Sequence, residues 1–205
     1  MTSDIYSNKQ KLFDRWAPHY DCLLTTVFYQ AVHKRLLEYV ELSPQPKVLD
    51  IGCGTGRLLH RLTIKFPTLE GIGLDLSTEM ISQAQQSNQH ADSITYRQGN
   101  AETLPFIDEQ FDAVFNTISF LHYPNPQKVL SEVSRVLRPN GRFYLADHTV
   151  PEAINTGYLP FFAGGLRLYS FKQREQLGMA AGLECLGHYY LLCPVMLTVF
   201  TKLVL

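Results

Sequence analysis

The chain has 205 residues, of which 45% are apolar and 18% are charged, and its formal net charge is −1. This length suits one domain with a full core, and a near-neutral chain lacks the basic surface that favours nucleic acid or anionic lipid. No apolar run approaches the roughly 18 residues of a membrane span, and Met1–Gln10 lacks the apolar core of a signal peptide. The four cysteines form no C-x-x-C pair. We therefore expect a single domain over residues 1–205 in the cytoplasm, with no nucleic-acid partner, no transmembrane segment and no metal.

Two helices are predicted before any strand. Apolar side chains on one face predict a helix over Ile5–Ala17, which Pro18 should end. Apolar residues at helical spacing predict a second helix over Thr25–Val40. Residues 1–44 are thus expected to form an N-terminal helical cap segment.

A glycine-rich turn follows the first predicted strand, Lys47–Ile51. Gly52, Gly54 and Gly56 give the pattern G-x-G-x-G, and a helix is predicted to begin near Gly56. A strand that ends in such a turn and leads into a helix is expected to present bare N–H groups beside a crevice. A ligand that carries a carboxylate, a phosphate or a sugar is therefore expected there.

The second predicted strand, Glu70–Asp75, ends in a carboxylate 19 residues after Gly56. An acid at the tip of the neighbouring strand can accept hydrogen bonds from both hydroxyls of a ribose. Residue 57 is Arg, whereas the dinucleotide fingerprint G-x-G-x-x-G requires Gly at that position. The spacing therefore fits S-adenosylmethionine better than NAD, because its single amino-acid tail needs no pyrophosphate cradle.

The remaining predicted elements alternate between helices and strands. In chain order they are a helix from Ser77 to about Asn88, strands Ile94–Gln98 and Phe111–Asn116, a helix from Asn125-Pro126 to Leu137, a turn at Pro139-Asn140-Gly141, a strand Arg142–Ala146, a helix from Ser170 to about Ala181-Gly182, and strands Glu184–Tyr190 and Val195–Leu203. The short turn between the last two strands makes them antiparallel. The pattern predicts an α/β, Rossmann-like three-layer sandwich with a seven-stranded, mostly parallel sheet and one antiparallel strand.

Four segments resemble a known family. Val48–Leu59 resembles the first motif of the class I S-adenosylmethionine-dependent methyltransferases, Gln98–Phe106 resembles their G-D-A-E-x-L-P-F segment, and Arg135–Arg142 resembles their R-V-L-K-P-G-G segment. Phe13–Asp21 is similar to the N-terminal F-D-x-x-A-x-x-Y-D segment of the ubiquinone/menaquinone-biosynthesis C-methyltransferase group. The resemblance implies methyl transfer from S-adenosylmethionine, with S-adenosylhomocysteine as product, to a small, partly apolar acceptor such as a quinol or phenol.

The predicted cofactor-binding residues lie in the turn and at the strand ends. They are Tyr20, Asp50, Gly52, Cys53, Gly54, Gly56, Asp75, Leu76, Met80, Asn100, Ala101, Glu102 and Asn116. Asn100 stands where the resembled family has an acid, and its side-chain carbonyl can accept the same hydrogen bond from the adenine amino group.

Several of these residues have a second reading. Tyr20 either approaches the methionine end of the cofactor, as the resemblance implies, or packs the segment onto the sheet. Asp50 either binds the cofactor amine or braces the turn, Met80 either flanks the adenine or belongs to the core, and Glu102 is either a ligand or a solvated loop acid.

Methyl transfer is an in-line displacement that needs a base only when the acceptor carries a proton that must leave. His122 and His148 follow strands at the carboxyl edge, and His19 can reach this edge from the N-terminal segment, so these three are the candidate bases. The other histidines (His33, His60, His90 and His188) are expected away from this edge, as structural or solvated residues.

Aromatic residues are expected on the acceptor side. They are Phe120 and Tyr123 after the fourth strand, and Tyr158, Phe161 and Phe162 in the segment 149–169. That segment has no periodicity and forms either a substrate lid or irregular packing. A nicotinamide-dependent oxidoreductase and a non-catalytic S-adenosylmethionine-binding scaffold remain alternative functions, and the protein is expected to be a monomer or a homodimer.

Overall fold

A computed structural model of the chain describes residues 2–20, 23–153, 157–159 and 165–203. For residues 2–5, 16–20, 23–26 and 157–159 only the backbone is described. The predicted site residues His19, Tyr20 and Tyr158 are therefore described without their side chains, and Phe161 and Phe162 lie outside the described residues.

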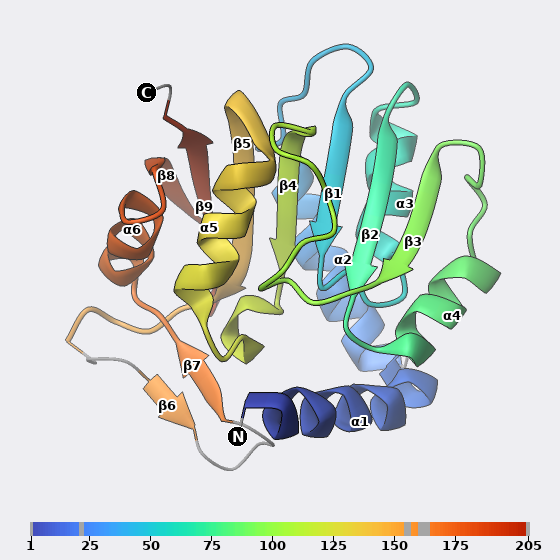
Figure 1. Cartoon of the computed structure of the whole chain (residues 1–205), viewed down its shortest axis with the longest axis horizontal. Helices are drawn as coiled ribbons and strands as arrows, with labels where there is room; N and C mark the ends of the chain where they lie inside the picture. Colours follow the sequence, from blue (N-terminus) through green and yellow to red (C-terminus); the bar gives the residue numbers. More distant parts are fainter. Residues whose placement is uncertain (1, 21–22, 154–156, 160–164, 204–205) are drawn as a thin grey trace.

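Seven strands form one twisted sheet in the order β3-β2-β1-β4-β5-β9-β8 (Figure 1). The strands are β1 (Lys47–Ile51), β2 (Glu70–Asp75), β3 (Ile94–Gln98), β4 (Phe111–Thr117), β5 (Leu137–His148), β8 (Leu183–Leu192) and β9 (Val195–Lys202). β9 runs antiparallel to both of its neighbours, and the other described pairings within this sheet are parallel. The predicted sheet, with its single antiparallel strand, is confirmed.

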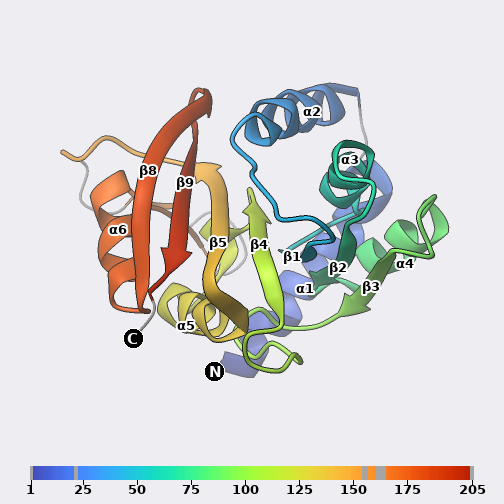
Figure 2. The ribbon, with the colours of Figure 1, turned by 90° about the horizontal axis from the view of Figure 1, so that it is seen from above.

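Helices cover both faces of the sheet and enclose two apolar clusters (Figure 2). α2 (Leu23–Leu37), α3 (Arg57–Lys65) and α4 (Thr78–Gln86) pack on one face, and α5 (Pro126–Val136) and α6 (Phe171–Met179) pack on the other. Local caps start three of these helices as predicted. Ser77 accepts a hydrogen bond from the N–H of Met80, Asn125 accepts one from the N–H of Lys128, and Ser170 forms a capping box with Gln173.

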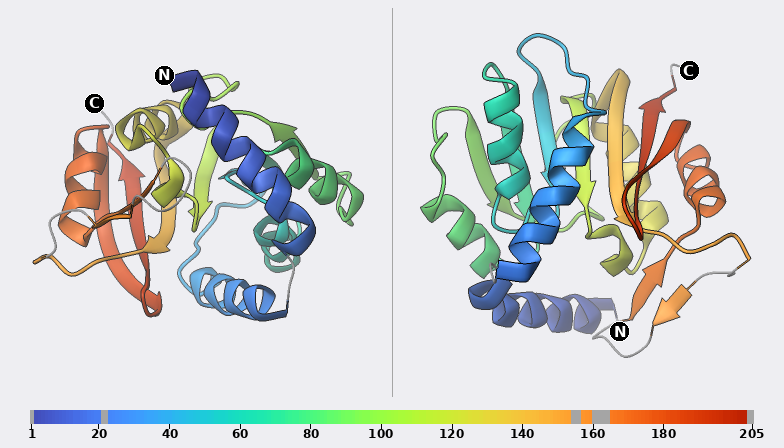
Figure 3. Two further views of the ribbon diagram at one scale, coloured as in Figure 1. Left: turned by 90° about the horizontal axis from the view of Figure 1, so that it is seen from below. Right: turned by 180° about the vertical axis from the view of Figure 1, so that it is seen from behind.

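Helix α1 (Thr2–Tyr20) lies across the carboxyl ends of the strands (Figure 3). The prediction that Pro18 ends this helix is wrong. Pro18 lies in the last turn of the helix. Its missing N–H removes only one hydrogen bond, to the carbonyl of Asp14, and the carbonyls that follow in the last turn have no helical donor in any helix. Asp14 fastens α1 to α4, because its Oδ1 accepts a hydrogen bond from the Ser77 hydroxyl at 2.5 Å.

Two further predictions about strands need correction. Pro139–Gly141 is not a turn ahead of the fifth strand but a bulge within β5, whose pairing with β4 moves from Phe111↔Leu137 to Ala113↔Arg142. The segment 149–169 contains an antiparallel pair, β6 (Gly157–Leu159) and β7 (Leu166–Leu168). These strands are too short for a periodic pattern to be visible in the sequence.

No helix in the described part of the chain has the length and apolar character that crossing a bilayer requires.

Candidate active site

The turn between β1 and α3 passes through three left-handed glycines. Gly52, Gly54 and Gly56 have φ angles of 70°, 53° and 81°. A Cβ on Gly52 would lie 2.3 Å from the hydroxyl oxygen of Ser119. Only glycine therefore lets this turn pass so close to the loop after β4.

The first three backbone N–H groups of the turn have acceptors inside the protein, although bare donors were predicted there. The N–H groups of Gly52 and Cys53 donate to the carbonyl of Leu74, at 2.7 and 3.1 Å. The N–H of Gly54 donates to Oδ2 of Asp75 at 2.8 Å. The end of β2 lies beside the turn and supplies these acceptors. The first half of the turn thus offers a tight backbone surface and a fixed carboxylate.

Asp75 is held rigidly at the tip of β2. Besides Gly54, its Oδ1 accepts a hydrogen bond from the N–H of Ser77 at 2.9 Å. Burial raises the pKa of this carboxyl, and the N–H donors around it oppose that rise. A carboxylate has about four acceptor sites. Asp75 can therefore keep its contacts to the backbone and still accept a hydroxyl donor.

A cavity lies at this edge of the sheet and brings together most of the predicted cofactor residues. Its walls include Gly52, Gly54, Asp75, Leu76, Met80, Asn100 and Ala101, together with the predicted acceptor-side residues His122 and Tyr123. Helix α1 closes the open side of this cavity with Tyr6, Lys9 and Phe13.

A second cavity lies behind the glycine turn and shares Gly52, Gly54 and Thr117 with the first. Asp50, at the end of β1, lines it and is only 1% exposed, and no described group bonds its Oδ1. Burial, and then the charge of Asp75, raise the pKa of Asp50. An unpartnered buried carboxylate suits a cationic ligand.

His33 also lines this second cavity, so the prediction that it lies away from the site is wrong. Its Nδ1 lies 3.2 Å from Nη1 of Arg61. Burial, and then the nearby arginines, lower the pKa of His33 to about 3. The packing of α2 against α3 brings His33 to the turn, and no pattern within α2 reveals that contact.

The candidate bases occupy different places. His122 lies in a short 3-10 helix, η1 (Phe120–His122), lines the first cavity and contacts the Phe13 ring edge-on at 5.0 Å. Burial, and then the charge of Lys9, lower the pKa of His122 to about 4. His148 ends β5, with its Nδ1 3.5 Å from Oδ1 of Asp147 and its ring 6.3 Å from that of Phe28, and it does not line the first cavity.

Comparisons with known proteins identify the family of this chain. Residues 49–145 match the family model described as a methyltransferase domain. A demethylmenaquinone methyltransferase of Thermotoga maritima is 33% identical over 177 residues, which cover 84% of this chain and 72% of that protein. The ubiquinone/menaquinone biosynthesis C-methyltransferase UbiE of Syntrophotalea carbinolica is 31% identical over 188 residues, which cover 89% and 75% of the two chains.

The chain belongs to the class I S-adenosylmethionine-dependent methyltransferases, in the group that resembles the ubiquinone/menaquinone-biosynthesis enzymes. The fold agrees with a solved methyltransferase in complex with the Haloferax volcanii Trm112 activator. The TM-score is 0.81 at 21% identity, over 94% of this chain and 98% of that one.

An amide network joins two strand ends of the methyltransferase. Asn116 is fully buried, and its Nδ2 lies 2.8 Å from the carbonyl oxygen of Ile51, 2.7 Å from Ser119 Oγ and 2.9 Å from the Tyr123 hydroxyl. Its Oδ1 has no partner among the described groups. Asn116 thus ties the ends of β1 and β4 together and holds Tyr123 in the cavity wall.

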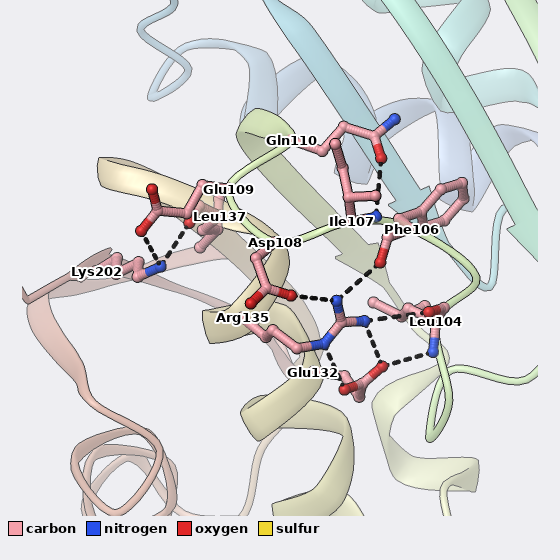
Figure 4. A network of polar contacts seen from close by, with 10 residues as sticks. All are labelled: Leu104, Phe106, Ile107, Asp108, Glu109, Gln110, Glu132, Arg135, Leu137 and Lys202. Atoms are coloured by element: carbon pink, nitrogen blue, oxygen red, sulfur yellow. Dashed lines mark hydrogen bonds and ion pairs between the residues drawn. The ribbon is translucent and has the colours of Figure 1, made fainter.

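The loop after β3 is held in place at both ends. Asn100 Oδ1 accepts the N–H of Glu102 at 2.9 Å, an Asx turn that asparagine and aspartate form equally well. At the far end, Arg135 of α5 donates to the carbonyls of Leu104 and Phe106, at 3.1 and 2.7 Å (Figure 4).

Two predicted site residues lie in the interior of the methyltransferase. Glu102 is 7% exposed, so the reading as a solvated acid is wrong. Its Oε1 accepts the N–H of Asn125 at 2.9 Å, which fixes the start of α5. Phe120 is 1% exposed and packs against Tyr123 and Tyr169 in the core, with ring centroids 5.9 and 5.4 Å apart.

The three residues that α1 contributes to the cavity wall, Tyr6, Lys9 and Phe13, were not predicted. Their spacing of three and four residues places them on one face of α1, and this signal is visible in the sequence. Lys9 interrupts the apolar stripe, and for that reason apolar periodicity alone overlooks this face.

Proposed function

We propose that this methyltransferase binds S-adenosylmethionine across both cavities and methylates a small, partly apolar acceptor on carbon or oxygen. The adenosine would occupy the first cavity and the methionine tail the second. The observation that carries this proposal is the meeting of the two cavities at the glycine turn, with Asp75 on one side and Asp50 on the other.

Each part of the cofactor has a matching group. Asp75 would accept a ribose hydroxyl, Leu76 and Met80 would flank the adenine, and Asn100 would accept from its amino group. The cationic amino group of the tail would pair with Asp50, whose Oδ1 has no partner among the described groups. A cation and an uncompensated buried carboxylate each relieve the other's desolvation cost.

The reaction needs little chemistry from the side chains. The sulfonium, when bound, supplies an activated methyl group for in-line displacement. The chain aligns the acceptor with this methyl group and excludes water, and Phe13, Ile118 and Tyr123 offer an apolar and aromatic wall for the acceptor.

The pKa of about 4 makes His122 a weak proton acceptor. A phenol with a pKa of about 10 holds its proton far more tightly than this imidazole. We therefore assign His122 a role in shaping the acceptor side of the cavity, and the acceptor would lose its proton to solvent.

Calorimetric titration with S-adenosylhomocysteine tests the cofactor site. Asp75→Ala should weaken binding by about 1–2 kcal/mol, the range taken for one charge-assisted hydrogen bond. Asp92→Ala, which removes an exposed acid before β3, is the matched control and should bind as the wild type does. Unchanged affinity in Asp75→Ala would mean that the ribose lies elsewhere.

An acceptor screen with quinols and phenols then separates an enzyme from a scaffold. The proposed enzyme transfers a methyl group to at least one class of acceptor. A scaffold binds S-adenosylhomocysteine with the same dependence on Asp75 and shows no transfer to any acceptor.

A further inference from the structure

Lys9 places a buried cation on the acceptor side of the first cavity. The residue is 4% exposed and lines the cavity together with Phe13 and His122. Its Nζ donates to the carbonyl oxygens of His122 and, at 3.4 Å, of Gly165. No carboxylate among the described side chains lies within ion-pair distance of it.

The groups around Lys9 are positively charged or neutral, which favours the binding of an anion. Burial, and then the positive charge of Arg167 on β7, lower the pKa of Lys9 to about 8, so the ammonium form still predominates at neutral pH. His122 adds no charge there, because its pKa is about 4.

The acid that interacts with His122, Asp147, is already engaged. Asp147 is 2% exposed, and its oxygens accept the N–H groups of Leu121 at 3.0 Å and of His148 at 2.6 Å. These bonds hold the acid on the β5 side of η1 and not against Lys9. A buried ammonium that contacts only carbonyl oxygens is costly unless an anion joins it.

We propose that Lys9 forms an oxyanion subsite, and that the acceptor binds with a phenolate or carboxylate oxygen against its ammonium group. This inference rests on the proposed function and narrows the acceptor class. The negative charge would offset two cations, the ammonium and the neighbouring sulfonium.

The subsite supplies the activation that His122 cannot. With a phenolic acceptor, the proton leaves to solvent and the ammonium stabilises the remaining oxyanion. A lone pair of the oxyanion then forms the new bond to the methyl carbon. The carbon–sulfur bond breaks with both electrons on sulfur, which leaves a neutral thioether. A carboxylate acceptor reacts in the same way without the loss of a proton.

The first test compares two probes of one shape, benzoate and benzamide, titrated into the protein saturated with S-adenosylhomocysteine. The wild type should prefer benzoate by about tenfold or more, the range for a hydrogen bond to a charged group. Lys9→Met should lose this preference, and Lys9→Arg, which keeps the charge, should retain most of it. Lys11→Met, on an exposed position of the same helix, is the matched control and should behave as the wild type does.

A second readout follows ionisation directly. A chromogenic nitrophenol that titrates near neutral pH reports its own protonation by absorbance. Its pKa should fall on binding to the wild type and to Lys11→Met but not on binding to Lys9→Met.

The outcomes separate the two proposals. Equal affinity for benzoate and benzamide in the wild type, or an unchanged benzoate preference in Lys9→Met, overturns the oxyanion subsite and leaves the cofactor site standing. A wild type that does not bind S-adenosylhomocysteine overturns the proposed function, and the subsite with it.

Discussion

Asp50 should lower the stability of the free protein, and we propose that it binds the amino group of the cofactor. It is 1% exposed, its Oδ1 has no partner among the described groups, and both burial and Asp75 disfavour its ionised form. Side chains that destabilise the free protein and are stabilised by a bound ligand are typical of functional sites. Removal of the Asp50 charge should therefore change the stability of the free protein and its affinity for the cofactor in opposite directions.

Asp50→Asn should make this opposition measurable. Removing the buried charge should raise the free energy of unfolding in urea by about 1 kcal/mol, whereas S-adenosylhomocysteine should bind more weakly by about 1–3 kcal/mol. The exposed Asp92→Asn should change neither quantity. A less stable variant with unaltered affinity would assign Asp50 only the bracing role.

At the scale of elements, α5 holds an irregular loop in place by means of one arginine. Arg135 pairs with Glu132 and Asp108, each at 2.8 Å, and Glu132 also accepts the N–H of Leu104 at 2.7 Å (Figure 4). The segment 99–110 contains no helix or regular strand, so these contacts replace the hydrogen bonds that such an element would supply. The same segment carries Asn100 and Ala101 into the first cavity.

Arg135→Met should therefore affect both stability and binding. The lost bonds to Leu104 and Phe106 should lower the free energy of unfolding by about 1–3 kcal/mol. Affinity for S-adenosylhomocysteine should also fall, because the cavity wall that we propose for the adenine would loosen. Arg138→Met is the control, since Arg138 pairs with Asp112 at 2.6 Å and its side chain is 44% exposed. Equal effects of the two changes on affinity would contradict a link between α5 and the adenine wall.

The elements predicted correctly are those whose signals are local. Ser77, Asn125-Pro126 and the Ser170 capping box each act within one turn of helix, so the sequence alone reveals them. Contacts between distant segments escaped prediction. Arg174 is 1% exposed and donates to the carbonyls of Asp147, His148 and Met196, yet nothing in its own helix distinguishes it from a surface arginine.

The same distinction applies to the site. Asp75 and the glycine turn could be found because their spacing is fixed within one strand–turn–helix–strand unit. Lys9 and His33 acquire their meaning only when α1 packs against α4 and η1, and α2 packs against α3. Those contacts join residues far apart in sequence. The sequence can show that Lys9 shares a helix face with Tyr6 and Phe13, but it does not show which part of the protein that face contacts.

At the scale of the whole molecule, packing of the N-terminal helices on the sheet should make stability depend on pH through the buried His33. His33 is 5% exposed, and its folded-state pKa of about 3 lies below the ordinary value of 6.5. The unfolded chain therefore binds a proton at His33 below about pH 6.5, whereas the folded chain does not. Stability must fall as the pH decreases through this range, because protons favour the state that binds them.

The size of this effect follows from one proton, at about 1.4 kcal/mol for each pH unit below 6.5. Between pH 7 and pH 5 the wild type should lose about 2 kcal/mol more stability than His33→Gln, which keeps an acceptor for Arg61 but does not titrate. Asp50 and Asp75, whose raised pKa values act in the opposite direction, titrate in both proteins and cancel in the comparison. Urea unfolding curves at both pH values measure the difference. Parallel losses in the two proteins would mean that His33 is charged or solvated in the folded state, and that α2 does not seal the second cavity against water.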